Sequence, residues 1–180
     1  MIKTRGYFGI GVERVSKPMN IGNLMRSANA FGAHFFFTIN SPLNLLTSYS
    51  DTSDSKQHVP LWQYKSVDEM HLPEKCILVG VEFCDNAIYL PTFPHPLSAA
   101  YILGPERGSL SSEISKKCSY LVKIPTKFCI NVGVAGAIVM YDRMLYMGKF
   151  GDRALSVKPS FSQQRLYEPT SHPKIHGPTK

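Results

Sequence analysis

The apolar residues of the chain gather in five short runs between residues 7 and 124. These runs show no strict alternation of apolar and polar residues, which is the pattern of strands that are covered on both faces. We therefore expect β-strands at residues 7–12, 34–39, 76–82, 99–103 and 120–124. The stretches 40–75 and 83–98 are polar or rich in proline, and we expect loops there, with a possible short helix at 66–71.

Helical periodicity appears between these strands. In residues 20–31, apolar side chains recur at i, i+3, i+4 and i+7 and make one apolar face. These side chains are Ile21, Leu24, Met25 and Ala28, and Gly32 is placed to end the helix. We expect two more helices, a short one near 111–117 and a long one over about 131–147. Strands that alternate with helices predict an α/β fold with a mostly parallel sheet and flanking helices.

The length of 180 residues suits one domain, and 43% of the residues are hydrophobic, which is enough for a sizeable core. We expect residues 1–150 to form this domain. Residues 151–180 contain four prolines and five basic residues and show little apolar periodicity. We expect them to form a flexible basic tail.

The formal net charge of +7 is unevenly distributed along the chain. Residues 1–40 carry a net charge of +4, residues 51–120 carry −3 and residues 121–180 carry +6. Two basic ends indicate a polyanionic partner such as nucleic acid. Charge alone leaves open the alternative that the protein is basic and binds nothing specific.

Several classes of protein are disfavoured by what the sequence lacks. Its cysteines form no CxxC pair and no histidine completes a zinc site, so we expect free thiols and no metal. No apolar stretch reaches the roughly 20 residues that span a bilayer, and no signal-peptide pattern follows Lys3 and Arg5. We expect a soluble protein of the cytoplasm with no membrane partner.

The segment 124–141 carries the strongest local signal. A strand leads into a loop broken by proline, and the loop leads into a helix whose first turns are crowded with small residues: Gly133, Ala135, Gly136 and Ala137. Because glycine inside a helix costs about 1 kcal/mol relative to alanine, we expect another helix, another subunit or a ligand to approach closely. Asn131 stands at the N-cap position of this helix. The alternative is a helix that simply packs in a core or a dimer interface.

Two earlier segments carry further candidate chemistry. Residues 20–26 read Asn-Ile-Gly-Asn-Leu-Met-Arg, and Arg26 lies about 140° around the helix from Ile21, away from the apolar face. We place the polar groups at the helix start, Asn20 among them, on that outer side too. Residues 103–108 read Leu-Gly-Pro-Glu-Arg-Gly and join a strand to a helix at the carboxyl edge of the sheet, where α/β proteins bind ligands. Taken singly, these segments are also compatible with a solvated helix start and an ordinary turn.

In this order and spacing, the three segments resemble the three motifs of the SpoU/TrmH-like branch of the SPOUT RNA methyltransferases. The resemblance covers roughly residues 5–150. It implies an α/β domain with a C-terminal deep trefoil knot, assembled as a homodimer. It also implies that S-adenosylmethionine binds in the knot and that the protein methylates ribose 2′-hydroxyls of tRNA or rRNA. The compact size is similar to that of members acting on tRNA, which favours tRNA over rRNA.

The resemblance also assigns roles to individual residues. Arg26 and Asn20 correspond to the catalytic pair of the first motif, and Glu106 and Asn131 correspond to the polar residues of the second and third motifs. The implied cofactor-binding residues are Val81, Leu103, Gly104, Glu106, Ile124, Cys129 and Ile130. The family often has serine two residues before and two residues after the third-motif asparagine, where this chain has Cys129 and Gly133 instead.

The chemistry of a guanidinium bears on the mechanism that the resemblance implies. Because this group keeps its proton at ordinary pH, we expect Arg26 to hold a phosphate and to stabilise the developing alkoxide, and not to act as the base. The alternative function is an RNA-binding module of the same fold that transfers nothing. The intact motif residues favour the enzyme, and no fingerprint supports a small-molecule enzyme that uses a nucleotide cofactor.

Overall fold

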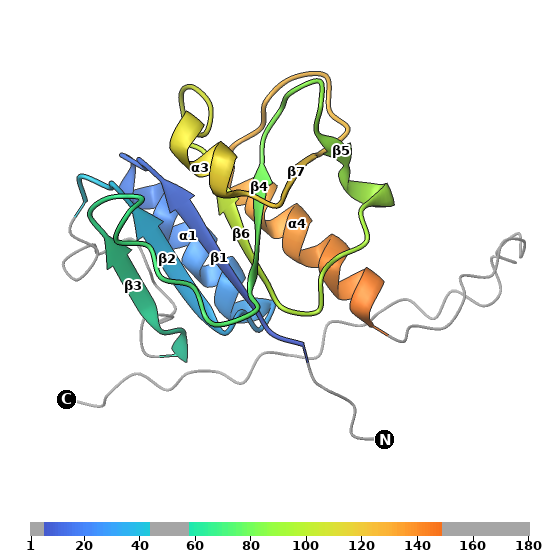
Figure 1. The fold of residues 1–180 in the computed structure, drawn as a ribbon, viewed down its shortest axis with the longest axis horizontal. Coiled ribbons are helices and arrows are strands. Elements are labelled where there is room, and N and C mark those ends of the chain that lie inside the picture. The colour runs from blue at the N-terminus through green and yellow to red at the C-terminus, as the bar shows by residue number, and fades with distance from the viewer. Residues whose placement is uncertain (1–5, 44–57, 149–180) are drawn as a thin grey trace, which may run out of the picture. The chain divides into compact units, whose positions relative to one another are not determined.

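A computed structural model describes residues 6–43 and 58–148, which form one sheet flanked by helices (Figure 1). The strands of this part are β1 (Phe8–Glu13), β2 (Phe35–Ile39), β3 (Leu61–Tyr64), β4 (Ile77–Val81), β5 (Ile88–Tyr89), β6 (Ala99–Leu103) and β7 (Tyr120–Lys123). Its helices are α1 (Pro18–Ala30), α3 (Ser112–Lys117) and α4 (Val132–Met147), together with the short 3-10 helix η1 (Leu90–Thr92). The tail expected at 151–180 lies outside the described residues, as does the segment 44–57.

The strands follow the order β3-β2-β1-β6-β4-β7-β5 across the sheet, and each neighbouring pair is parallel. The prediction of an α/β fold with a mostly parallel sheet is therefore confirmed. In a parallel sheet the carboxyl ends of all strands lie at one edge. The loops that leave β1, β4, β6 and β7 consequently meet there, although they are far apart in the sequence.

The five predicted strands and three predicted helices are present, but two strands at the edges of the sheet were not predicted. The strand β3 lies inside the polar segment 40–75, and residues 65–69 form a bend and a turn where the sequence allows a short helix at 66–71. The strand β5 and the helix η1 lie in the segment 83–98, which the sequence predicts as loop. Both strands are short, and pairing with β2 and β7 holds them in the sheet.

Two apolar layers cover the two faces of the sheet. The helices α1 and α4 pack side by side on one face, and α3 lies on the other (Figure 1). Alternate residues of β1 face opposite layers, and Phe8, Ile10 and Val12 all face the α1–α4 layer. On the opposite face, Gly9 and Gly11 leave space that the rings of Phe35 and Phe37 on the neighbouring strand β2 occupy.

Each helix begins at a residue suited to that position. Pro18 stands in the first turn of α1, where a missing N–H costs nothing, and Gly32 follows the helix with a φ of +72°. The side chain of Ser111 caps α3 by accepting a hydrogen bond from the backbone N–H of Ile114. Asn131 caps α4 by accepting from the N–H groups of Gly133 and Val134, which confirms the predicted N-cap.

The small residues at the start of α4 let α1 approach closely. A Cβ atom on Gly136 would collide with the side chain of Leu24 in α1. A Cβ atom on Gly133 would lie 3.3 Å from Cβ of Asn23 and 3.7 Å from the carbonyl oxygen of Asn20. Of the three kinds of neighbour that the sequence allows, another helix of the same chain therefore accounts for these glycines.

A buried polar cluster fixes the carboxyl half of α4 against the loop before β6. Arg143, only 4% exposed, donates from Nη1 to the carbonyl oxygen of Pro96 (2.6 Å) and from Nη2 to that of Leu97 (2.8 Å). It also donates to the hydroxyl of Tyr101 at 3.1 Å. His95 contacts the same hydroxyl through Nδ1 and lies 2.9 Å from the Asp142 carboxylate through Nε2. The bonds made by Asp142 and Arg143 join residues more than 40 positions apart and tie α4 to the sheet.

The His95 ring predicts how stability depends on pH. Burial lowers its pKa below the ordinary value of 6.5, and the Arg143 guanidinium lowers it further, although the Asp142 carboxylate opposes both. The folded protein therefore binds this proton more weakly than the unfolded chain does, so the stabilising contribution is present above pH 6.5 and is lost as the pH falls below that value. Chemical denaturation at pH 7, 6 and 5 should show a falling free energy of unfolding, with a smaller fall in a His95→Gln variant. An equal fall in both proteins would contradict this assignment.

Candidate active site

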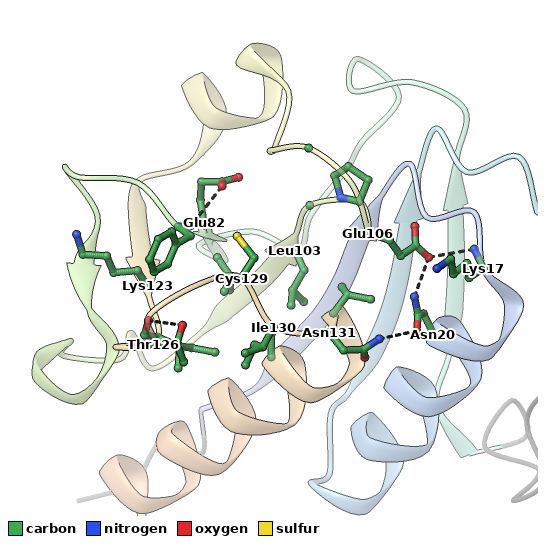
Figure 2. Close-up of a pocket in the computed structure, with 18 residues that line it drawn as sticks. Lys17, Asn20, Glu82, Leu103, Glu106, Lys123, Thr126, Cys129, Ile130 and Asn131 are labelled. Atoms are coloured by element: carbon green, nitrogen blue, oxygen red, sulfur yellow. Dashed lines mark hydrogen bonds between the residues drawn. The ribbon is translucent and has the colours of Figure 1, made fainter.

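A cavity of about 350 Å³ opens at the carboxyl edge of the sheet (Figure 2). Its walls come from the ends of β4, β6 and β7, from the loop 124–131 and from the first turn of α4. The lining includes all seven residues for which the resemblance implies cofactor binding: Val81, Leu103, Gly104, Glu106, Ile124, Cys129 and Ile130. The start of α1 adds Lys17 and Asn20 to the lining, so segments from four distant parts of the chain form one hollow. It lies at the edge where parallel α/β sheets bind their ligands.

A chain of hydrogen bonds connects the three sequence motifs beside this cavity. The amide Nδ2 of Asn131 donates to Oδ1 of Asn20 at 2.9 Å. The amide Nδ2 of Asn20 in turn donates to Oε1 of Glu106 at 3.0 Å (Figure 2). Each amide therefore donates in the same direction, towards the carboxylate. Three of the four residues predicted as catalytic lie in one network.

The Glu106 carboxylate receives donors from a second direction. The backbone N–H of Lys17 donates to Oε1 at 3.0 Å, and the N–H and hydroxyl of Ser16 donate to Oε2 at 3.2 and 3.3 Å. Partial burial would raise the pKa of this carboxyl, but the hydrogen bonds from Asn20, Ser16 and Lys17 outweigh it and lower the pKa below its ordinary value. Glu106 is therefore ionised at neutral pH and places a fixed negative charge at the cavity.

Asn20 does not lie where the sequence places it. It is 6% exposed and faces inward, whereas the helical wheel puts the polar groups at the start of the helix on the outer side. The prediction is wrong because the wheel separates polar from apolar neighbours and cannot show a buried polar partner. Here Glu106 and Asn131 supply that partner on both sides of the Asn20 amide.

Arg26 is exposed, as predicted, but it does not line the main cavity. It lines a second, more open hollow between the outer surfaces of α1 and α4, together with Asn23, Ser27, Phe31 and Tyr141. Asn131 contributes to both hollows and therefore separates them. The structure brings Asn20, Glu106 and Asn131 together and leaves Arg26 on the other side of Asn131.

Several residues that line the cavity were missed by sequence reasoning. Glu82 and Phe83 follow β4 directly, and Lys123 and Thr126 flank the end of β7 (Figure 2). A polar residue that immediately follows a buried parallel strand is a signal that could have identified Glu82. The sequence around Lys123 gives no comparable signal. Lys123 is the last residue of β7, and it reaches the cavity only because β7 pairs between β4 and β5, which are distant in the sequence.

The loop after β6 is held in place by charged residues from neighbouring strand ends. The Glu82 carboxylate accepts from the backbone N–H of Leu110 at 2.7 Å, and the buried Glu13 carboxylate accepts from the N–H of Ser111 at 2.8 Å. The Arg14 guanidinium donates to the carbonyl oxygen of Ser109 at 2.7 Å. These bonds fix the second motif relative to the other walls of the cavity.

Within residues 6–43 and 58–148, no group of three or more His, Cys, Asp or Glu side chains could hold a metal ion. No helix in this part of the chain is long and apolar enough to cross a membrane. The four cysteines are free thiols, and Cys129 is the exposed one, in the wall of the cavity.

Comparison with known proteins finds similar proteins that are named as RNA methyltransferases. The chain is 23% identical over 172 residues to the tRNA (guanosine(18)-2′-O)-methyltransferase of Escherichia coli K12, an alignment that covers 91% of this chain and 75% of that protein.

Solved structures share the fold. The SpoU methyltransferase AviRb from Streptomyces viridochromogenes, in complex with AdoMet, superimposes with a TM-score of 0.68 at 24% identity and covers 78% of this chain. This chain spans 61% of the AviRb chain. A structure described as giving insights into the 2′-OH methylation of C/U34 on tRNA has a TM-score of 0.68 at 23% identity, and the match covers 81% of this chain and 93% of that one.

The family model described as the SpoU rRNA methylase family matches residues 8–141, which is most of the chain and contains all three motifs. The match runs from the first residue of β1 into α4 and so includes every wall of the cavity. The protein belongs to the SpoU rRNA methylase family.

Proposed function

We propose that this protein transfers a methyl group from S-adenosylmethionine to a ribose 2′-hydroxyl of RNA. The observation that carries the proposal is the network in which Asn131, Asn20 and Glu106 connect the three motifs at the edge of a single cavity. Family membership supports the reaction class, and the named activity of the Escherichia coli relative supports the 2′-hydroxyl as the acceptor.

The lining of the cavity fits this cofactor in size and in chemistry. A volume of about 350 Å³ lies within the range of small-molecule sites. Val81, Leu103, Ile124 and Ile130 provide apolar walls that suit a purine, and the backbone of the 103–106 and 124–130 loops provides polar groups. When it is bound, S-adenosylmethionine supplies an electrophilic methyl group on a positively charged sulfur.

The charge of Glu106 gives this residue a role in our proposal. Its lowered pKa keeps the carboxylate ionised, and a fixed negative charge favours a cationic ligand over a neutral one. Asn20 and the Ser16–Lys17 backbone hold the carboxylate in place, and Asn131 holds Asn20. These bonds all come from the chain itself, and a charge held in one orientation by the protein is what electrostatic preorganisation requires.

Arg26 is assigned to the RNA side of the reaction. It lies in the hollow that shares Asn131 with the cavity, where it can reach a phosphate next to the acceptor ribose. A guanidinium offers several donors in a planar fork and keeps its proton, so it stabilises developing negative charge without acting as the base. Methyl transfer from a sulfonium to a hydroxyl is an in-line displacement, and positioning of the two reactants supplies much of its rate.

Basic residues beside the cavity support RNA as the substrate. Arg14, Lys17 and Arg107 line a hollow that also includes Ser16, Pro105 and Glu106, directly next to the proposed methyl-transfer site. Cations in this position can neutralise backbone phosphates, which carry most of the nonspecific affinity of proteins for nucleic acids. We favour tRNA over rRNA because two of the similar proteins are described by their action on tRNA. The tail at 151–180 would add further basic contacts, and the cytoplasm is the compartment we expect.

We also propose a homodimer with a knotted carboxyl part. The outer face of α4 exposes the large apolar side chains of Val134, Tyr141, Met144 and Leu145. A second copy of the chain would cover this face and the hollow that contains Arg26. The family resemblance implies a deep trefoil knot, and the path of the chain supports it. The strand β7 lies between β4 and β5, and α4 then returns across the sheet to pack on α1.

Calorimetric titration with S-adenosylmethionine separates the enzyme from an RNA-binding module of the same fold. The native protein should bind one equivalent per chain, and a Glu106→Ala variant should bind more weakly because the fixed charge and its network are lost. No binding to the native protein would favour the module. The Cys129 and Gly133 departures from the family pattern do not by themselves favour it, since the cavity is present with both.

A further inference from the structure

The cavity has two chemically different ends. Figure 2 shows Glu106, Lys17 and Asn20 at one end, and Glu82, Lys123 and Thr126 at the other. The first end contains Asn20 and Glu106, two of the motif residues that concern methyl transfer. The second end contains the Glu82 carboxylate, which belongs to none of the motifs and has no role in the proposed methyl transfer.

The Glu82 carboxylate is fixed in position. Its residue directly follows β4, and its backbone N–H donates to the carbonyl oxygen of Val122 at 2.9 Å. Oε2 accepts from the N–H of Leu110 at 2.7 Å, and Oε1 accepts from the N–H of Phe83 at 3.1 Å. Each carboxylate oxygen can accept more than one hydrogen bond, so both retain capacity towards the cavity.

The neighbouring cation does not neutralise this carboxylate. Lys123 directs its ammonium to the carbonyl oxygens of Cys84 (2.9 Å) and Asp85 (3.2 Å) and lies 4.7 Å from the centre of the Tyr89 ring. An acceptor-only group therefore faces the cavity at this end. The ligand group that fits it is a hydrogen-bond donor, and a pair of adjacent hydroxyls fits best because a carboxylate has two oxygens.

We propose that Glu82 binds the ribose hydroxyls of the cofactor and so selects a ribonucleoside at this end of the cavity. The inference rests on the proposed function, because it takes S-adenosylmethionine as the ligand. A carboxylate at the carboxyl end of a parallel strand that accepts from a ribose hydroxyl is an established solution in other nucleotide-binding sheets. Phe83, 46% exposed and also in the cavity wall, offers an aromatic surface next to the same nucleoside.

The same carboxylate also holds the loop after β6, and the test has to separate the two roles. Glu13 provides the matched control, because it holds the neighbouring residue of the same loop through the N–H of Ser111 at 2.8 Å. It is 2% exposed and does not line the cavity. A Glu13→Gln variant therefore loosens the loop without removing an acceptor from the ligand site.

The experiment is calorimetric titration of the native protein, Glu82→Gln and Glu13→Gln with S-adenosylhomocysteine and with its 2′-deoxy and 3′-deoxy analogues. The native protein should bind at least one deoxy analogue about tenfold to one hundredfold more weakly, because a hydrogen bond to a charged group is lost. Glu82→Gln should bind S-adenosylhomocysteine more weakly and should lose most of that discrimination. Glu13→Gln should keep the native ratio, whatever happens to its overall affinity.

The outcomes distinguish this inference from the function on which it rests. If the native protein binds S-adenosylhomocysteine and Glu82→Gln discriminates against the deoxy analogues as strongly as the native protein does, the role of Glu82 is wrong and the proposed function stands. If the native protein binds neither S-adenosylhomocysteine nor S-adenosylmethionine, both are wrong. Should Glu82→Gln fail to fold, equal affinity of the native protein for all three ligands would overturn the inference by itself.

Discussion

An Arg26→Lys variant should lose about 10²–10³-fold in the rate of RNA methylation while its affinity for S-adenosylmethionine stays native. The positive charge is retained, but the planar fork of donors that can hold a phosphate and an alkoxide together is lost. Cofactor affinity should persist because Arg26 lies outside the cavity, in the hollow on the far side of Asn131. A residue that bound the cofactor would show the opposite pattern.

Single-turnover methylation with saturating cofactor measures the transfer step directly, and calorimetry on the same preparation measures cofactor affinity. A Lys116→Arg variant is the matched control, because it exchanges the same two side chains on the exposed surface of α3. It should transfer methyl groups at the native rate. Near-native turnover of Arg26→Lys would show that charge at this position is sufficient and would remove the argument for a fixed guanidinium.

The second large effect concerns stability, and it comes from Arg143. An Arg143→Met variant should lose about 2–5 kcal/mol of the free energy of unfolding. Methionine fills much of the same space, but the carbonyl oxygens of Pro96 and Leu97 lose the donors that the guanidinium provides. The carbonyl oxygen of Tyr7 loses one donor and keeps the N–H of Ala99. Each buried acceptor left without a partner costs about 1–3 kcal/mol. A loss of this size is a large fraction of the stability of an ordinary domain.

Denaturant unfolding followed by circular dichroism measures this change, with Lys116→Met as a control for the removal of a surface cation. The control should stay within about 0.5 kcal/mol of the native protein. An Arg143→Lys variant should recover only part of the loss, because an ammonium cannot reach carbonyl groups that the guanidinium contacts from two nitrogen atoms. If Arg143→Met were as stable as the native protein, the buried cluster would not be what holds α4 against the sheet.

The central strands and the helices were predictable because local sequence determines them. Continuous apolar runs mark β1, β2, β4, β6 and β7, and a helical apolar stripe marks α1. The edge strands β3 and β5 were not predictable, since their four and two residues become strands only through pairing with distant segments. The burial of Arg143 and its hydrogen bonds were also not predictable, because two of its partners lie 46 and 136 positions away in the sequence.

In the candidate site too, the residues of the motifs could be predicted from local sequence, whereas their contacts with distant segments could not. The motifs identified Asn20, Glu106 and Asn131, but the direction of the hydrogen bonds between them depends on how α1 and α4 pack. Asn20 was placed on the wrong side of its helix for that reason. Glu82 belongs to no motif, and although its place directly after β4 is a local signal, its contact with the loop after β6 depends on the fold.

Transfer of a labelled methyl group tests the central claim, which is the 2′-O-methylation of RNA. The native protein is incubated with S-adenosylmethionine that carries an isotopically labelled methyl group, together with separate tRNA and rRNA fractions from cells that lack the protein. Mass spectrometry of the digested RNA then locates the label. We predict a labelled 2′-O-methylnucleoside from the tRNA fraction, and none with Glu106→Ala. Label on a base, or no label in either fraction from a protein that binds the cofactor, would contradict the proposed activity.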